Sequence, residues 1–371
     1  MNRFIISGGG TGGHIFPALA IANQLKKEDS GAELLFIGAN GKMEMSRVPE
    51  AGYRIIGLDV FGLRRDFSWS GLKNNVKLPV MVFKTIYKAK QIIRQFKPDM
   101  VIGVGGYASW PALRAAQAMN IPTLIQEQNS YPGKANKWLS KKAVKICVAY
   151  DGMDQFFPKD KIVKTGNPVR AEIIKCQSKS EESYTFFNLD KNKKTVLILG
   201  GSQGARTLNQ AILEHIDDFK KTDNQLLWQT GELFYTSNKM QLSDLESSNI
   251  KIVPFIKRMD LAYGVADYIV SRAGALAIAE LAIVAAPTIL IPLPTAAEDH
   301  QTANAKQLSD VGAAILLPDK DVKEKLYPTL VNLINDVEKS KILAQKIKNF
   351  AHPEAIHKIV ECIKQTNEQS V

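Results

Sequence analysis

Residues 4–14 read Phe4-Ile5-Ile6-Ser7-Gly8-Gly9-Gly10-Thr11-Gly12-Gly13-His14, and this stretch decides the fold. An apolar run leads into a glycine-rich turn, where glycine accepts positive φ and lets backbone N–H groups approach a ligand. Pro17 and the helix-forming run Ala18–Leu25 predict a helix directly behind the turn. Since a helix N-terminus attracts anions, the stretch predicts a strand, a phosphate-type loop and a helix, with His14 as a candidate base.

The glycine-rich turn argues against two common nucleotide-binding classes. It lacks the G-x-x-x-x-G-K-[ST] pattern, so a P-loop NTPase is disfavoured. It matches the dinucleotide pattern G-x-G-x-x-G only loosely, and Glu33 opens the next strand instead of ending it. An NAD oxidoreductase or a non-catalytic binding module is therefore disfavoured as well.

Length and composition predict a cytosolic protein of about two domains. The chain has 371 residues, of which 45% are hydrophobic. Its three cysteines are widely spaced and form no CxxC, which favours a reducing compartment. No export signal is expected at the N-terminus. The longest apolar region, residues 277–294, contains Glu280 and three prolines, which argues against a membrane span.

The excess of positive over negative charge lies entirely in the first half of the chain. Residues 1–166 carry 24 basic and 12 acidic side chains, whereas residues 167–371 carry 24 and 25. Residues 67–98 contain seven basic side chains and no acidic one, and residues 128–150 contain five, again without an acid. The first half is therefore expected to meet an anionic partner. Nucleic acid ranks low, because no nucleic-acid module is recognisable.

Short apolar runs alternate with helical patterns along the whole chain, which is typical of parallel sheets. A second opening of strand, glycine loop and helix occurs at Lys194–Leu199, Gly200–Ala205 and Arg206–Ile216. The sequence therefore predicts an α/β protein of two Rossmann-like domains facing across a cleft. The strands expected are Phe4–Ser7, Glu33–Ile37, Met100–Val104, Thr123–Gln126, Ile146–Val148, Ile162–Lys164, Gln225–Thr230, Ile250–Pro254, Tyr268–Ser271, Thr288–Ile291 and Ala313–Leu316, with a surface excursion at Gln177–Tyr184.

Six motifs in order resemble the MurG family of peptidoglycan glycosyltransferases, and together they cover residues 7 to about 305. They are residues 8–20, Gly105-Gly106-Tyr107-Ala108-Ser109, Glu127-Gln128-Asn129, Gly166-Asn167-Pro168-Val169-Arg170, Gly200-Gly201-Ser202-Gln203-Gly204-Ala205, and Ser271-Arg272-Ala273-Gly274-Ala275 with Glu280. Each motif alone is weak, whereas the ordered set is specific.

The resemblance implies a GT-B fold and inverting transfer of N-acetylglucosamine from UDP-N-acetylglucosamine to the muramyl 4-hydroxyl of lipid I, giving lipid II. It implies no required metal or other cofactor. It further implies an acceptor and membrane-docking domain at residues 1–166 and a UDP-sugar domain at residues 167–345, with a helix near residues 346–366 packing back on the first. A peripheral place at the cytoplasmic face of the plasma membrane, and cell-wall synthesis or division proteins as partners, also follow from it.

The resemblance assigns most donor contacts to polar residues in the second half. Ser202, Gln203 and Arg272 would hold the diphosphate, since helix N-termini and guanidinium groups both suit phosphate oxygens. Glu280 would bind the ribose hydroxyls, Ile256 the uracil through its backbone, and Gln301 the sugar hydroxyls. No role is assigned to His300. Thr11, Gly12, Gly13, Asn129 and Arg170 complete the donor set. A structural arginine at position 272 and an ion-paired Glu280 remain the alternatives.

Two candidate bases are expected in the first half. An imidazole titrates near neutrality, which favours His14, and Glu127 ends an expected strand, where α/β proteins carry reactive groups. Gly10, Tyr107 and Ser109 are expected on the acceptor side, where the first glycine loop would cradle the lipid diphosphate. Two residues depart from the family pattern: Gln126 stands where a histidine is common, and Trp110 where a glycine is common.

The basic segment at residues 67–98 is also apolar, which suits docking to anionic lipid. The docking residues expected are Trp69, Lys73, Lys77, Phe83, Lys84 and Lys88, with Pro79 interrupting any continuous helix. The alternative is a solvated helix face over a core. A glycosyltransferase with another lipid acceptor and a UDP-N-acetylglucosamine 2-epimerase are the rival functions, and the epimerase would need no docking surface.

Overall fold

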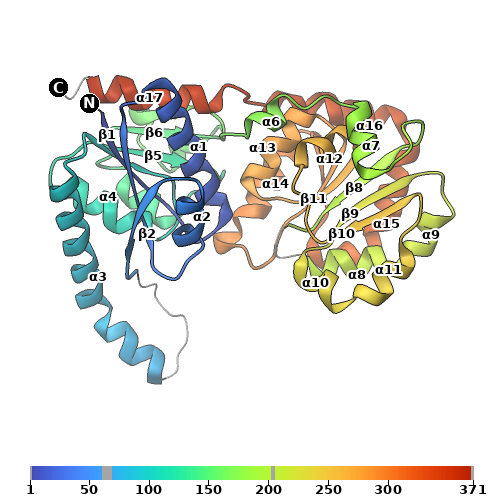
Figure 1. The fold of residues 1–371 in the computed structure, drawn as a ribbon, viewed down its shortest axis with the longest axis horizontal. Coiled ribbons are helices and arrows are strands. Elements are labelled where there is room, and N and C mark those ends of the chain that lie inside the picture. Colours follow the sequence, from blue (N-terminus) through green and yellow to red (C-terminus); the bar gives the residue numbers. More distant parts are fainter. Residues whose placement is uncertain (1, 61–68, 202–204, 369–371) are drawn as a thin grey trace. The chain divides into compact units, whose positions relative to one another are not determined.

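The computed structural model describes residues 2–60, 69–201 and 205–368 and divides the chain into two compact units. One unit comprises Met1–Pro168 and Glu354–Val371, and the other comprises Val169–Pro353. Each unit is a parallel sheet flanked by helices (Figure 1). The expected α/β class with two Rossmann-like halves is confirmed.

The first unit contains a seven-stranded parallel sheet in the order β3-β2-β1-β4-β5-β6-β7. The strands are β1 (Arg3–Ser7), β2 (Glu33–Ala39), β3 (Arg54–Leu58), β4 (Met100–Gly103), β5 (Thr123–Glu127), β6 (Lys145–Val148) and β7 (Ile162–Lys164). The helices are α1 (Gly12–Glu28), α2 (Glu44–Glu50), α3 (Trp69–Phe96), α4 (Ser109–Ala118), α5 (Lys134–Leu139) and α17 (Ala355–Glu368), with 3-10 turns η1 (Met153–Gln155) and η2 (Lys159–Lys161).

Alternate residues of β1 enter the two cores of the first unit, because successive side chains of a strand point to opposite faces. Phe4 and Ile6 pack with α1 and α17 on one face. Ile5 packs on the other face with α3 and α4. The C-terminal helix α17 thus covers the same face as α1, beside which it lies in Figure 1.

The second unit repeats this plan with six parallel strands in the order β10-β9-β8-β11-β12-β13. The strands are β8 (Thr195–Leu199), β9 (Gln225–Gln229), β10 (Ile250–Val253), β11 (Tyr268–Arg272), β12 (Thr288–Ile291) and β13 (Ile315–Leu316). The helices are α6 (Ala171–Ile174), α7 (Glu181–Phe187), α8 (Arg206–Glu214), α9 (Ile216–Lys220), α10 (Glu232–Ser237), α11 (Lys239–Leu245), α12 (Met259–Val265), α13 (Ala275–Val284), α14 (His300–Ser309), α15 (Val322–Asn335) and α16 (Val337–Ile347), with η3 (Ala297–Asp299), η4 (Asp319–Asp321) and η5 (Lys348–Phe350).

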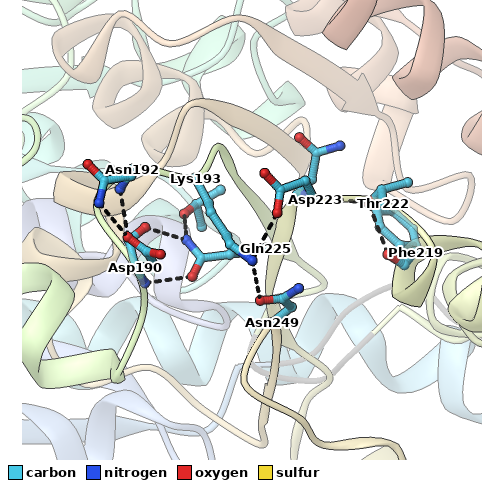
Figure 2. Close-up of polar contacts among 10 residues, drawn as sticks. Asp190, Asn192, Lys193, Phe219, Thr222, Asp223, Gln225 and Asn249 are labelled. Carbon is cyan, nitrogen blue, oxygen red and sulfur yellow. Dashed lines mark hydrogen bonds and ion pairs between the residues drawn. The ribbon is translucent and has the colours of Figure 1, made fainter.

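Polar contacts gather at the amino-terminal edge of the second sheet, where β8 and β9 begin; Figure 2 shows those around Gln225. The buried Gln225 amide accepts from Asp190 N at 2.6 Å and donates to Asp190 O at 2.8 Å and to Thr195 Oγ1 at 3.1 Å. Lys193 Nζ bonds Asn249 Oδ1 at 3.3 Å and pairs with Asp223 at 2.9 Å. These contacts are structural, and parallel sheets bind ligands at the opposite, carboxyl edge.

One expectation about local structure is wrong, and one strand was not predicted. The α3 helix continues through Pro79. A proline removes one backbone hydrogen bond and its ring presses against the carbonyl four residues before it, but the hydrogen bonds of the other turns maintain the helix. The segment expected as a surface excursion does lie at the surface, with residues 177–179 and 181–182 exposed. It also contains the start of α7, which is capped by Ser180 and buries Tyr184. Strand β3 was not expected, because its short sequence Arg54-Ile55-Ile56-Gly57-Leu58 contains a glycine, which weakens strand patterns.

Candidate active site

The first glycine loop lies where the strand order of the first sheet reverses, between β1 and its neighbours β2 and β4. Parallel sheets bind ligands outside the carboxyl ends of strands at this point. The loops after β1, β4 and β5 therefore meet at one edge, because these three strands are adjacent. They carry the motifs Gly8–Gly13, Gly105–Ser109 and Gln128–Asn129.

The end of the first glycine loop opens helix α1. Gly10 adopts φ 90°, and Thr11 O accepts the first helical bonds, from His14 N at 3.1 Å and Ile15 N at 3.2 Å. Gly12 and Gly13 begin the helix, where N–H groups have no partner inside the helix and point out of its end. This geometry suits an anion at Gly12 and Gly13.

Glu44, which the sequence reasoning missed, lies buried beneath the first glycine loop. Its Oε2 accepts from Gly10 N at 3.0 Å and its Oε1 accepts from Ala39 N at 3.0 Å. A Cβ atom at Gly9 would overlap the Glu44 carboxylate, which would then have to move away from the two N–H groups that it binds. Because Gly10 N–H already serves Glu44, it is not among the amides that the loop offers to a phosphate.

His14 is half-buried on the first turn of α1, and its Nδ1 atom faces two oxygens. It lies 3.0 Å from Val104 O and 3.0 Å from Gln128 Oε1. A carbonyl oxygen only accepts, so Nδ1 carries the proton and Nε2 is the basic nitrogen. Gly105 makes room for the ring, since a Cβ there would lie 2.9 Å from His14 Cε1.

The second candidate base, Glu127, is buried and surrounded by amide donors. Its Oε1 accepts from Asn129 N at 3.0 Å and Asn129 Nδ2 at 3.2 Å, and its Oε2 accepts from Asn136 Nδ2 at 2.8 Å. Burial raises the pKa of Glu127, and these hydrogen bonds oppose the rise. The carboxylate shapes the loop after β5, and the sequence reasoning did not identify Asn136 as its partner.

The two side chains expected on the acceptor side differ in accessibility. Tyr107 is exposed, and its ring lies against Gly10, where a Cβ would be 3.3 Å from Tyr107 Cε1. Ser109 is fully buried and donates to Gly106 O at 2.9 Å. Tyr107 is therefore placed to meet a ligand, whereas Ser109 supports the Gly105–Gly106 turn from below.

The second glycine loop occupies the same position in the second sheet, after β8 and beside β11. Gly201 adopts φ 80°, and α8 begins at Arg206. Ser202 and Gln203 lie outside the residues that the structure describes.

Arg272 ends strand β11 and is held by three oxygens. Its Nη1 donates to Asp319 Oδ1 at 2.5 Å, Ile291 O at 3.3 Å and Pro292 O at 3.2 Å. Asp319 also accepts from Thr207 Oγ1 in the first turn of α8 at 3.0 Å. Asp319, which was not predicted from the sequence, joins the end of β11 to the start of α8.

Arg170 and Glu280, both expected donor contacts, form an ion pair within the second unit. Glu280 Oε1 accepts from Arg170 Nε at 3.0 Å and Nη2 at 2.8 Å, and Tyr263 Oη donates to Glu280 Oε2 at 3.0 Å. Burial raises the pKa of Glu280, against the opposing effect of Arg170. The buried Tyr263 therefore holds the Glu280 side chain in place. This role was not predicted, because Tyr263 lies in an apolar helix and looks like a core residue.

The two remaining donor candidates lie in loops at the carboxyl edge of the second sheet. Ile256 is buried and its N–H donates to Gln229 Oε1 at 3.0 Å. Gln301 Oε1 accepts from Leu293 N at 2.9 Å. The turn before Gln301 contains Glu298 and Asp299 at φ 55° and 53°, a conformation that costs non-glycine residues energy and is concentrated at functional sites.

One face of α3 exposes apolar side chains among lysines. Val80, Phe83 and Tyr87 are 60%, 71% and 53% exposed, and Lys84 and Lys88 lie exposed beside them. The spacing i, i+3, i+7 places the three apolar residues on one face. Of the expected docking residues, the side chains of Trp69, Lys73 and Lys77 lie outside the described part of the structure.

The described residues contain neither a membrane-spanning helix nor a cluster of metal-binding side chains. Within residues 2–60, 69–201 and 205–368, no helix has both the length and the apolar character needed to cross a membrane. The same residues contain no group of three His, Cys, Asp or Glu side chains arranged to hold a metal ion.

Comparison with known proteins shows similarity along nearly the whole chain. Residues 4–148 match the glycosyltransferase family 28 N-terminal domain, and residues 195–359 match its C-terminal domain. A relative from Parabacteroides distasonis is 49% identical over 97% of this chain and 96% of its own, and one from Cytophaga hutchinsonii is 50% identical over 96% and 95%. Both are named UDP-N-acetylglucosamine–N-acetylmuramyl-(pentapeptide) pyrophosphoryl-undecaprenol N-acetylglucosamine transferase.

Solved structures give the same picture of the fold. The crystal structure of Acinetobacter baumannii MurG is 30% identical, covers 98% of this chain and 100% of its own, and superposes with a TM-score of 0.79. A UDP-GlcNAc 2-epimerase from Neisseria meningitidis has a TM-score of 0.66 at 17% identity, covering 98% of this chain and 100% of its own, and therefore shares the fold alone.

Proposed function

The chain belongs to glycosyltransferase family 28, and from this premise we propose that it transfers N-acetylglucosamine from UDP-N-acetylglucosamine to lipid I, giving lipid II. The observation that carries this proposal is the sequence identity to a transferase named for this reaction, which is 49% over 97% of the chain and so extends over both units. The α/β GT-B fold agrees with this activity. The enzyme is a UDP-N-acetylglucosamine-dependent glycosyltransferase.

We propose His14 as the general base. In the reaction, the 4-hydroxyl of the muramyl sugar attacks C1 of N-acetylglucosamine, the C1–O bond to UDP breaks with inversion, and the hydroxyl proton passes to His14 Nε2. The geometry supports this role because Nδ1 is committed to Val104 O and Gln128 Oε1, which leaves Nε2 as the basic atom. Glu127 is the weaker candidate, since both its oxygens hold the loop after β5.

The diphosphate site proposed for the donor is the carboxyl edge of the second sheet. The start of α8 after Gly200–Gly201 supplies the N-terminal end of a helix, and Arg272 supplies a cation at the end of β11. These groups stabilise the negative charge on departing UDP, so we propose that transfer requires no metal. Glu280, held by Arg170 and Tyr263, is proposed to bind the ribose. The backbone of Ile256 would bind the uracil, and Gln301 the sugar hydroxyls.

The remaining site residues lie in the first unit, and we propose that they contact the substrates. Gly12 and Gly13, with Thr11, offer the helix N-terminus to a phosphate. The exposed Tyr107 and neighbouring Gly10 are proposed to meet the acceptor. Asn129 stays among the donor contacts, with its loop position fixed by Glu127.

We propose that the α3 surface docks the enzyme to the cytoplasmic face of an anionic membrane. The supporting observation is the exposed apolar face of Val80, Phe83 and Tyr87 beside Lys84 and Lys88. Trp138 on α5 is 69% exposed within a second basic segment. Apolar side chains that enter the lipid interface, flanked by lysines that meet anionic headgroups, are typical of peripheral membrane binding.

The deciding experiment measures transfer of labelled N-acetylglucosamine from UDP to a lipid I analogue, with and without EDTA. Lipid II is expected in both cases, and omission of the acceptor should abolish sugar transfer. Folded protein that makes no lipid II would refute the proposed function. Activity that EDTA abolishes and Mg²⁺ restores would refute only the metal-free mechanism.

A further inference from the structure

A chain of three buried side-chain amides leads from the end of the first unit to His14. Asn167 Nδ2 donates to the backbone carbonyl of Gln128 at 2.9 Å, and Asn167 Oδ1 accepts from Gln126 Nε2 at 3.1 Å. Gln126 Oε1 in turn accepts from Gln128 Nε2. Gln128 Oε1 then lies 3.0 Å from His14 Nδ1.

The directions of these hydrogen bonds follow from one fixed point. The Gln128 backbone carbonyl only accepts, so the Asn167 atom facing it must be the amide nitrogen. The Asn167 oxygen therefore faces Gln126, the Gln126 oxygen faces Gln128, and the Gln128 oxygen faces His14. Gln128 Nε2 also donates to Val104 O at 2.8 Å, which supports the same orientation.

We propose that Asn167, Gln126 and Gln128 act as a positioning relay that holds His14 in the tautomer with its proton on Nδ1. Were the Gln128 amide reversed, its NH₂ group would face the Nδ1 proton and favour the opposite tautomer. Together with Val104 O, which also accepts from Nδ1, the relay thus keeps Nε2 deprotonated and basic. It also gives Gln126, where the family commonly has histidine, a specific task in this chain.

The relay involves groups without charge, so it orients His14 without adding a charge next to it. The two carboxylates on the surrounding loops have other partners: Glu44 binds Gly10 and Ala39 N–H groups, and Glu127 binds Asn129 and Asn136. A catalytic histidine held in the wrong tautomer loses most of its activity even when its position is kept. The tautomer of His14 follows from the hydrogen bonds alone. Its effect on catalysis rests on the proposed function, in which His14 is the general base.

The tautomer is measured directly on the wild-type protein by NMR with ¹⁵N-labelled histidine. The chain has five histidines, so the His14 signals are assigned by replacing the other four one at a time. At a pH where His14 is neutral, Nδ1 is expected to be protonated and Nε2 unprotonated. A proton on Nε2 would overturn the proposal.

Two variants test the relay through kinetics. Gln128→Met removes one of the two oxygens that accept from Nδ1 and leaves Val104 O, so the tautomer is held less strongly. The value of kcat should fall roughly threefold, with the KM for UDP-N-acetylglucosamine unchanged. Gln128→Glu places a carboxylate beside the ring, which stabilises imidazolium, so the acidic limb of the kcat profile should move to higher pH.

The control is Gln117→Glu, which makes the same change at another buried glutamine. Gln117 bonds Thr123 Oγ1 and Leu139 O, and Thr123 begins the strand that Glu127 ends. This control reports the effect of a new buried carboxylate at the start of β5, away from His14. It should not move the kcat profile along the pH axis. If the folded Gln128 variants behave like the control, the relay is refuted. If the tautomer is as inferred but His14→Gln keeps full turnover, the proposed base is wrong and the relay remains.

Discussion

Glu44→Gln should destabilise the first unit by about 2 kcal/mol. The Glu44 carboxylate is buried and accepts two backbone hydrogen bonds, from Gly10 N and Ala39 N, both at 3.0 Å. Glutamine has the same shape but a single accepting oxygen, so one of these N–H groups would face an NH₂ group. Losing one hydrogen bond to a charged acceptor costs about 1.5–3 kcal/mol.

The assay is urea unfolding followed by tryptophan fluorescence, which reports mainly the first unit because Trp69, Trp110 and Trp138 lie there. The control is Glu50→Gln, at an exposed position on the same helix, where the ion pair with Arg47 is worth at most about 1 kcal/mol. If the two variants unfold at the same urea concentration, Glu44 does not hold the glycine loop as inferred. Turnover should also fall in Glu44→Gln, because α1 and His14 follow directly from this loop.

Three further perturbations address the site and the docking surface. His14→Ala should lower kcat by about 10²–10⁴, and an unchanged rate would move the base to Glu127. Tyr263→Phe removes the hydrogen bond to Glu280 Oε2 and should raise the KM for UDP-N-acetylglucosamine about tenfold, whereas an unchanged KM would leave Glu280 without a role in donor binding. Replacing Lys84 and Lys88 with serine should weaken binding to anionic vesicles by about 1 kcal/mol per charge. If replacing the exposed Lys341 and Lys348 of the second unit has the same effect, the α3 surface is an ordinary solvated helix face.

The repeated strand, loop and helix pattern could be predicted from the sequence because it is local. Residues 4–28 show the apolar run, the glycines and the helix formers in direct succession, and residues 194–216 repeat them. The same local reasoning failed at Pro79, where the sequence predicted a break and the helix continues. The energy of a helix depends on the bonds of all its turns, so one missing N–H bond did not decide its path.

The candidate site was predictable only as a set of residue types. His14, Glu127, Arg272 and Glu280 were identified from their place after strands and glycine loops. Their partners were not, because Asp319 lies 47 residues from Arg272 and Arg170 lies 110 residues from Glu280. A carboxylate and a guanidinium distant in sequence carry no signal of their pairing before the chain folds.

The sequence by itself determined the α/β class, the two glycine loops, the confinement of the excess positive charge to the first half and the family. These properties depend on residue order and composition over short distances. The tertiary structure decided which groups of the site are engaged: Glu44 against Gly10, Glu127 between Asn129 and Asn136, and the direction of the amide chain that ends at His14. Hydrogen bonds are directional and act over about 3 Å, so the protonation of a residue 114 positions from Gln128 is settled only when folding brings the two together.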